Sequence, residues 1–330
     1  MRKPRQTNQK TSSKNTQIKK PPIVPPIKCQ GIKTKLTGNI KALLPDQFNG
    51  VWIEPFLGSS VVALNVQPRR AILADTNRHI IGLYSSIQNG EITPTIVKDY
   101  LIDANTNLLR DGADYYYQVR DRFNKEGNSL DFLFLNRACF NGVMRFNSKG
   151  KFNVPFCKKD NRFAQAYVTK IVNQVKGFVK VLEGKEWEFI TSSFENTLAR
   201  AQPEDIVYAD PPYLGRHTDY FNTWDEETDH RLNETLHNLP CRFIYSTWHS
   251  NDFRCNYAIQ EYWTRSNYHI LKREHFYHVG SSEDLRNPVV EAIVINFPLP
   301  ATAPEPNAQP TPARAEPPQL IFQFEAASAG

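Results

Sequence analysis

Residues 206–213 read IVYADPPY and join a short apolar run to a rigid polar loop. The run 206–208 is apolar, with β-branched and aromatic side chains, which favours a buried strand. Pro211 and Pro212 fix the backbone that follows and remove two N–H donors, so the nearby carbonyls have no local competitor. The sequence therefore predicts a preorganised loop at the carboxyl end of a strand.

The side chains of this loop suit a planar substrate that carries an exocyclic amino group. Asp210 and the carbonyl of Pro211 can accept the amino hydrogens, and the ring of Tyr213 offers a face for stacking. An amino nitrogen conjugated with a ring is a poor nucleophile, and two acceptors favour the pyramidal form that attacks an electrophilic methyl group. We interpret Asp210, Pro211, Pro212 and Tyr213 as catalytic candidates. On these four residues alone, a surface turn is the alternative.

Further short apolar runs resemble this strand and are separated by segments long enough for helices. They lie at residues 51–53, 71–74, 189–190, 243–245 and 291–297. This alternation predicts an α/β fold with a doubly wound, mostly parallel sheet. The alternation breaks after residue 80, where helical periodicity appears at 96–109 and 130–136 and a hairpin signal appears at 144–154. We therefore predict an inserted, mainly helical domain that contains a β-hairpin.

The expected organisation is a divided catalytic domain, one insertion and two tails. The catalytic domain comprises residues 27–79 and 170–297, and the insertion comprises 80–169. Residues 1–26 are basic and Pro-rich and residues 298–330 are Pro-rich, so both tails are expected to be disordered.

Other features of the composition narrow the class of protein. No run of about 18 apolar residues predicts a membrane span, and the basic amino terminus lacks the apolar part of a secretory signal, so we expect a cytoplasmic protein. Five cysteines without CxxC spacing fit a reducing compartment. His275 and His278 have the spacing of two metal ligands, but without a third ligand we interpret them as surface histidines and expect no metal.

The net charge of +6 is concentrated in two places. Seven of the first 20 residues are Lys or Arg and none is acidic, so the rest of the chain sums to −1. Within that remainder, residues 137–162 carry a local charge of +6 and four phenylalanines. Basic and aromatic groups together suit phosphates and unstacked bases. A solvated hairpin packed by its own phenylalanines is the alternative.

Two more loops follow predicted strands and should lie at the same edge of the sheet as Asp210. Residues 54–60 read EPFLGSS and follow the first apolar run, and Asp75 follows the second, 19 residues beyond Phe56. An acid at this position can accept hydrogen bonds from ribose hydroxyls. Because ligands bind outside the carboxyl ends of parallel strands, we expect a nucleotide-like ligand here.

Together these motifs resemble the Dam-like class of N6-adenine-specific DNA methylases, over most of residues 27–297 and in that family's order. The similar segments are KCQGIK at 28–33, EPFLGSS at 54–60, ILADTN at 72–77, the recognition stretch at 135–156, and the DPPY loop. The resemblance implies a Rossmann-like fold that uses S-adenosyl-L-methionine as methyl donor.

The resemblance also implies roles for individual residues. The residues expected to line the cofactor site are Cys29, Lys33, Phe56, Gly58, Asp75, Ser193, Phe194 and Asp210. The residues expected at the DNA, including basic ones of the charged segment, are Arg137, Phe140, Asn141, Arg145, Lys149 and Lys151.

Three positions depart from the family's pattern. Cys29 stands where an aromatic residue is usual, and Ile32 and Ser60 each replace a glycine. Because Cys29 removes a stacking surface, we expect weaker cofactor binding than is typical, which isothermal titration would test.

The expected function is site-specific methylation of a flipped-out adenine at N6 in a short double-stranded DNA site, without a metal or covalent intermediate. We expect a monomeric type II restriction-modification methylase, associated with the nucleoid through DNA and encoded near a cognate endonuclease; a stand-alone or phage-borne enzyme is the alternative. The resemblance suggests GATC as the recognition site, with other short palindromes, which members with the same motifs use, as the alternative. The alternatives are an N4-cytosine methylase, an RNA or protein methyltransferase, and a degenerate DNA-binding module. Asp210 and the stretch 135–156 favour adenine in DNA.

Overall fold

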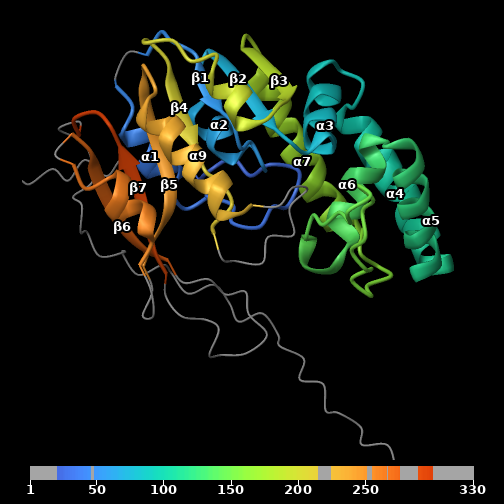
Figure 1. The fold of residues 1–330 in the computed structure, drawn as a ribbon. Coiled ribbons are helices and arrows are strands. Elements are labelled where there is room, and N and C mark those ends of the chain that lie inside the picture. The colour runs from blue at the N-terminus through green and yellow to red at the C-terminus, as the bar shows by residue number, and fades with distance from the viewer. Residues whose placement is uncertain are drawn as a thin grey trace, which may run out of the picture.

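The computed structural model describes residues 21–45, 48–214, 224–250, 255–265, 267–275 and 289–299. These residues form a seven-stranded sheet in the order β3-β2-β1-β4-β5-β7-β6 (Figure 1). The strands are β1 Trp52–Glu54, β2 Arg70–Asp75, β3 Glu186–Thr191, β4 Ile206–Ala209, β5 Arg242–Ser250, β6 His269–His275 and β7 Val289–Ile295. β1 to β5 pair in parallel, and β7 runs antiparallel to both of its neighbours. The predicted fold class is confirmed.

The order of the strands reverses next to β1. From β1 the chain continues to β2 and β3 on one side, and then crosses back to β4 and β5 on the other. Trp52 of β1 therefore pairs with Ala71 on one side and Ile206 on the other. Such a reversal leaves a crevice at the carboxyl ends of the two central strands, where open α/β sheets bind their ligands.

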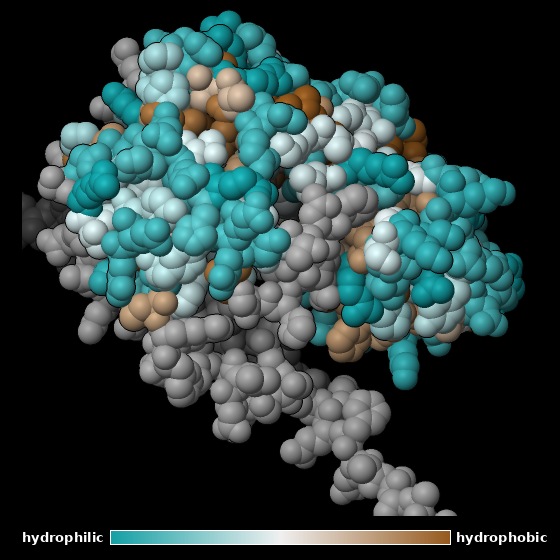
Figure 2. All heavy atoms as spheres, viewed as in Figure 1, coloured by the Kyte–Doolittle hydropathy of each residue, from teal (hydrophilic) through white to brown (hydrophobic). Residues whose placement is uncertain are grey.

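Successive residues of the central strands face two separate apolar cores. Trp52 and Ile206 pack into one core, whereas Ile53 and Val207 pack into the other. Both faces of the sheet are thus covered, which explains why these strands read as continuous apolar runs. On the face of the molecule seen in Figure 2, hydrophilic residues cover most of the surface and apolar ones form small patches.

Helices cover the sheet and build a separate lobe. They are α1 Thr37–Ala42, α2 Val61–Val66, α3 Arg78–Gln88, α4 Pro94–Asp111, α5 Ala113–Glu126, α6 Ser129–Ala138, the 3-10 helix η1 Phe140–Gly142, α7 Gln165–Leu182, α8 Phe194–Leu198, α9 Glu226–His237 and α10 Tyr257–Tyr262. Among the described helices, none is long and apolar enough to cross a membrane.

The lobe comprises α4, α5 and α6. It lies between β2 and β3 in the sequence and at the opposite end of the molecule from β6 (Figure 1). α4 and α6 confirm the helices predicted at 96–109 and 130–136. In place of a regular hairpin ladder, an isolated bridge joins Phe146 to Phe152 around a turn. The division of the chain at residues 80 and 169 stays a prediction, because α3 packs on β2 and β3 while α7 packs on both α3 and α4.

Two expectations about the ends of the fold are corrected. Residues 21–26 were expected to be disordered, yet the backbone N–H of Ile23 donates to Asn65 Oδ1 at 2.8 Å and the Asn65 amide donates back to Ile23 O at 2.9 Å. Pro25 and Pro26 are buried. A Pro-rich segment can be buried when its carbonyls accept hydrogen bonds from nearby donors. Leu299 also packs against the core. Residues 1–20 and 300–330 lie outside the described part of the chain.

Strand β6 was not among the strands predicted from the sequence. Its residues read HILKREH, and the sequence offers too few apolar positions to mark a strand. It is the outermost strand and pairs only with β7 in the described sheet. An edge strand that is partly solvated carries little apolar signal.

Candidate active site

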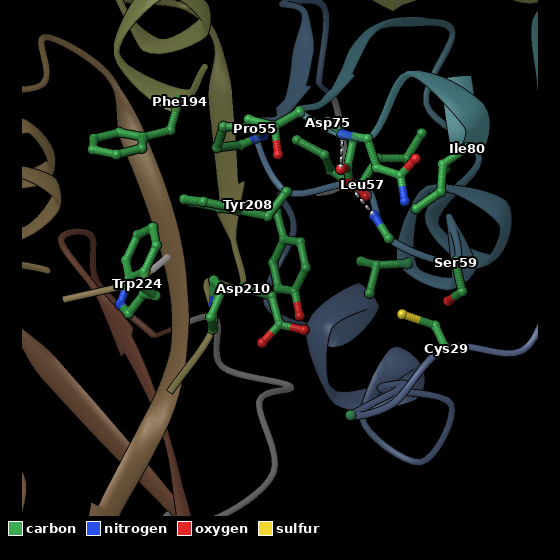
Figure 3. Close-up of a pocket in the computed structure, with 18 of the residues that line it drawn as sticks. Cys29, Pro55, Leu57, Ser59, Asp75, Ile80, Phe194, Tyr208, Asp210 and Trp224 are labelled. Carbon is green, nitrogen blue, oxygen red and sulfur yellow. Dashed lines mark hydrogen bonds between the residues drawn. The ribbon is translucent and has the colours of Figure 1, made fainter. Parts of the chain in front are cut away.

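The crevice beside β1 contains a cavity of about 310 Å³. It is lined by the loops after β1, β2, β3 and β4, and by the segment before α1. All of the residues predicted to line the cofactor site lie around it: Cys29, Lys33, Phe56, Gly58, Asp75, Ser193, Phe194 and Asp210. Figure 3 shows Phe194 and Trp224 at one side of this cavity, Cys29 at the other, and Asp210 between them.

Asp75 is held by the loop that follows β1. Its Oδ2 accepts a hydrogen bond from Gly58 N–H and its Oδ1 accepts one from Asn77 N–H, both at 2.8 Å. Burial raises the pKa of the Asp75 carboxyl, and these two N–H groups oppose the rise. Each oxygen keeps a second acceptor position for a hydroxyl of a ligand. The loop therefore fixes the Asp75 carboxylate, and its oxygens can each accept a further hydrogen bond from a ligand in the cavity.

The loop reaches Asp75 because its backbone turns through the left-handed region. Gly58 has φ 48°, and Cys29 Sγ lies 3.4 Å from where a Cβ on Gly58 would be. Ser60 has φ 62°, a conformation that a glycine would adopt without strain. Cys29 therefore lies at the cavity wall against the loop at Gly58, whereas Ser60 of the same loop is fully buried. Their predicted effect on cofactor affinity stays a prediction.

Asp210 is paired with a buried lysine. Lys33 Nζ lies 2.9 Å from Asp210 Oδ1 and donates to Gly31 O at 3.0 Å. Burial raises the pKa of Asp210 to about 6, against the opposing charge of Lys33 and with a smaller contribution from Glu291. Asp210 is therefore mostly ionised at neutral pH but lies close enough to its pKa to gain a proton in mild acid.

The two prolines and Tyr213 continue the loop after Asp210. Pro212 lines the cavity with Asp210, whereas Pro211 is buried. Tyr213 is 9% exposed, and Lys33 Nζ lies 5.1 Å from the centroid of its ring. Its hydroxyl donates to Glu291 Oε1 at 3.5 Å. The role of the Tyr213 ring as a stacking face stays a prediction.

Aromatic side chains close the cavity where β3 ends. Ser193 caps α8 by accepting from Asn196 N–H at 3.3 Å, and so places Phe194 at the start of that helix. The ring centroids of Phe56 and Phe194 are 5.7 Å apart, and the centroid of Trp224 lies 5.5 Å from Phe56. Three rings around one side of the cavity form a surface suited to a planar group.

Several cavity residues were not among the sequence candidates. Trp224 offers no local signal apart from its position just before α9. Glu54 was quoted in a motif but given no role; it is 1% exposed and accepts from Trp52 Nε1 at 2.7 Å, and burial raises its pKa to about 8. Glu54 and Glu291 could have been identified from the sequence, because each is a charged residue within an apolar strand.

The residues predicted to contact DNA separate into exposed and buried groups. Phe140 is 55% exposed, and Asn141, Lys149 and Lys151 are exposed around the same loop. Arg145 is half-buried and donates from Nε to Asn153 Oδ1 at 2.9 Å. In contrast, the other phenylalanines of this segment are in the core, so the alternative of a self-packed hairpin holds for Phe146, Phe152 and Phe156.

Arg137 requires a correction. Its side chain is 3% exposed, donates from Nε to Pro26 O at 2.6 Å and also donates to the Gln174 side chain. The guanidinium satisfies the carbonyls of the amino-terminal segment and ties that segment to α7. It is therefore a structural residue and does not face DNA.

The described residues contain no group of three His, Cys, Asp or Glu side chains that could hold a metal ion. The side chain of His275 and all of His278 lie outside the described residues.

Comparisons with known proteins agree with this geometry. Residues 30–279 match the family described as D12 class N6 adenine-specific DNA methyltransferase. The chain is 30% identical to the DNA adenine methylase of Escherichia coli K12 over 257 residues, which is 74% of this chain and 86% of that protein. It is 34% identical to the DNA adenine methylase of Haemophilus influenzae over 197 residues, or 57% of this chain and 63% of that protein.

A third relative is a larger protein. The chain is 26% identical over 285 residues to the type II methyltransferase M.FokI of Planomicrobium okeanokoites, and the match covers 83% of this chain but 43% of that protein. The family match covers well over half of the present chain and includes the loops that form the cavity. This chain therefore belongs to the D12 class of N6 adenine-specific DNA methyltransferases.

Proposed function

We propose that the cavity binds S-adenosylmethionine and that the loop at Asp210 presents an adenine, rotated out of double-stranded DNA, for methylation at N6. The observation that carries this proposal is the meeting of Asp75 and Asp210, from loops after different parallel strands, at one cavity. In this proposal Asp75 holds the ribose of the cofactor and Asp210 holds the amino group of the substrate.

The residues present fit the cofactor. A volume of about 310 Å³ suits a molecule of this size. The aromatic cluster of Phe56, Phe194 and Trp224 suits its adenine, and the anchored Asp75 suits its ribose hydroxyls. When bound, S-adenosylmethionine would supply the electrophilic methyl group.

The contribution of the chain to transfer is to hold the target amino group in a reactive orientation. Asp210 is ionised above its pKa of about 6 and can accept one amino hydrogen, while the carbonyl of Pro211 can accept the other. These acceptors keep the nitrogen lone pair out of conjugation with the ring and align it with the methyl group. Rotation of the base out of the duplex is required because N6 is not accessible for transfer inside the helix.

We further propose that the chain acts as a monomer on DNA in the cytoplasm and that a cognate endonuclease is encoded nearby. Similarity to the type II methyltransferase M.FokI supports a modification partner. Expression of the chain should then protect plasmid DNA from that endonuclease. Plasmid that remains fully cleavable would exclude this role while leaving methylation at another site open to test.

The proposed function is tested by incubating the purified chain with tritiated S-adenosylmethionine and unmethylated DNA, followed by nucleoside mass spectrometry. N6-methyladenine is the expected product. N4-methylcytosine would reassign the target base, and label on RNA or protein alone would reassign the substrate class. Failure to bind the cofactor would identify a degenerate binding module.

Asp75→Asn is expected to raise the dissociation constant of S-adenosylmethionine by about 10- to 100-fold. The new amide NH₂ must face either Gly58 N–H or Asn77 N–H, so a donor would oppose a donor and the loop after β1 would lose its anchor. Isothermal titration measures the change. Asp99→Asn, on the exposed face of α4, is the matched control. Equal affinity in the wild type and Asp75→Asn would remove Asp75 from the site.

Arg145→Ala is expected to reduce discrimination between the cognate site and single-base variants by about 10- to 100-fold. Arg145 is positioned by Asn153, which suits a residue that contacts a base edge. Lys149 is exposed at the turn, so Lys149→Ala should instead weaken binding to all sequences alike and reduce the salt dependence. Binding isotherms on cognate and mismatched duplexes at two salt concentrations distinguish these effects. Unchanged discrimination in Arg145→Ala would contradict its assignment.

A further inference from the structure

Glu291 is a buried acid in a strand that otherwise reads as apolar. β7 has the sequence VVEAIVI, and Glu291 is 2% exposed. It pairs in register with Trp248 of β5 and Arg273 of β6. Ile293, two residues further along the same face of the strand, belongs to the apolar core. A carboxyl group in this setting is costly unless nearby groups compensate its charge.

The compensating groups belong to the active site. Glu291 Oε1 lies 4.0 Å from Lys33 Nζ and accepts from the Tyr213 hydroxyl at 3.5 Å. The same ammonium group lies 2.9 Å from Asp210 Oδ1 and packs over the Tyr213 ring. Lys33 therefore lies between two acids, one from the catalytic loop and one from the carboxyl-terminal end of the sheet.

We propose that Glu291 is a positioning residue of the methyltransferase site, which holds Lys33 and Tyr213 and thereby sets the orientation and charge of Asp210. The inference rests on the proposed function of Asp210. Glu291 lies beyond residues 30–279, the part of the chain that matches the family.

The physical basis is competition for the lysine. An ammonium group drawn only to Asp210 would occupy acceptor positions that the adenine amino group requires. A second acid shares the attraction of Lys33 and leaves Asp210 better able to accept from substrate. The bond from the Tyr213 hydroxyl to Glu291 also fixes that ring relative to the sheet. Glu291 thus stabilises an arrangement in which Lys33 compensates Asp210 without sequestering it.

The arrangement affects protonation of Asp210 in a direction that can be measured. The charge of Glu291 opposes ionisation of Asp210 and so adds to the rise in the pKa of Asp210 that burial causes. Removal of that charge should therefore lower the pKa of Asp210. The titratable groups that interact with Asp210 among the described residues are Lys33, Cys29, Glu54, Tyr208, Tyr245 and Glu291.

The test is Glu291→Gln, which keeps the shape and an acceptor for Tyr213 but removes the charge. We expect kcat to fall about tenfold while KM for S-adenosylmethionine stays within about threefold. The acid limb of the kcat/KM profile for DNA should move to lower pH by about half a unit or more. Glu186→Gln, an exposed glutamate of β3, is the matched control and should leave both quantities unchanged.

A purely structural role would lower thermal stability and leave kcat and the acid limb of the folded enzyme at wild-type values, which would overturn the inference. Tyr213→Phe provides a second test because it removes the same contact from the other partner. It should lower kcat about threefold, and the double variant should be no slower than Glu291→Gln alone. Independent, multiplicative losses would also overturn the inference. Failure of the proposed function is distinguished from these outcomes, because the wild-type chain itself would then not methylate adenine.

Discussion

Asp210→Ala is expected to lower methyl transfer to adenine by about 100- to 1,000-fold or more, while most of the affinity for DNA is retained. Asp210 is the proposed side-chain acceptor; it follows β4 and lies where the cavity meets the rigid proline loop. Its loss removes an interaction that strengthens as the amino nitrogen becomes pyramidal, so kcat should change more than binding. The residues proposed to contact DNA, in the exposed loop near Phe140, are unchanged in this variant.

Single-turnover transfer of tritium to DNA and a separate binding isotherm measure the two effects of Asp210→Ala. Asp114→Ala, an exposed acid of α5 in the helical lobe, provides the control. A rate within threefold of the wild type would show that Asp210 is not the acceptor. Parallel losses of rate and DNA affinity would indicate that the loop binds substrate in its ground state instead.

The loops proposed for catalysis and for cofactor binding were predictable because local sequence determines their conformation. Pro211 and Pro212 fix a conformation without help from distant residues, and the apolar runs before Glu54, Asp75 and Asp210 each predict a strand whose carboxyl end must lie at one edge of a parallel sheet. The structure brings these three acids to one cavity. Because β2, β1 and β4 are adjacent in the sheet, three loops that are each predictable from local sequence form one site.

The residues that were missed or misassigned depend on contacts between distant segments. Arg137 belongs to a basic segment and was expected at DNA, but Pro26, 111 residues earlier, provides the carbonyl that holds it. Glu291 becomes part of the site only because β7 inserts beside β5, antiparallel to it. Periodicity and charge patterns describe one segment at a time and contain no information on such pairings.

The acid pair around Lys33 also connects stability to pH. The ordinary pKa of an aspartate is 3.8, and that of Asp210 in the folded chain is about 6. Between these values the folded state binds more protons than the unfolded state, so the stability contributed by Asp210 is present at low pH and is lost as the pH rises through about 6. Lys33 limits this loss by opposing the rise in pKa.

Lys33→Met is therefore expected to destabilise the chain, and to do so more at pH 8 than at pH 5. The lysine is 6% exposed, and its removal leaves Asp210 and Glu291 without the cation that lies between them. Removing one partner of a buried ion pair lowers the free energy of unfolding by about 3–5 kcal/mol when the other partner stays charged. In acid Asp210 can take up a proton instead, so the cost should shrink.

Thermal unfolding of Lys33→Met and the wild type at pH 5 and pH 8 tests this account. Lys35→Met removes an exposed lysine two residues away and should shift the melting temperature little at either pH. Glu54, whose pKa is raised to about 8, contributes the same sign of pH dependence to every variant, so the difference from the wild type isolates Lys33. An equal loss of melting temperature at both pH values would mean that Lys33 acts through packing of its aliphatic stem. A larger loss at pH 8 would establish that the charge of Lys33 compensates the ionised carboxylate of Asp210.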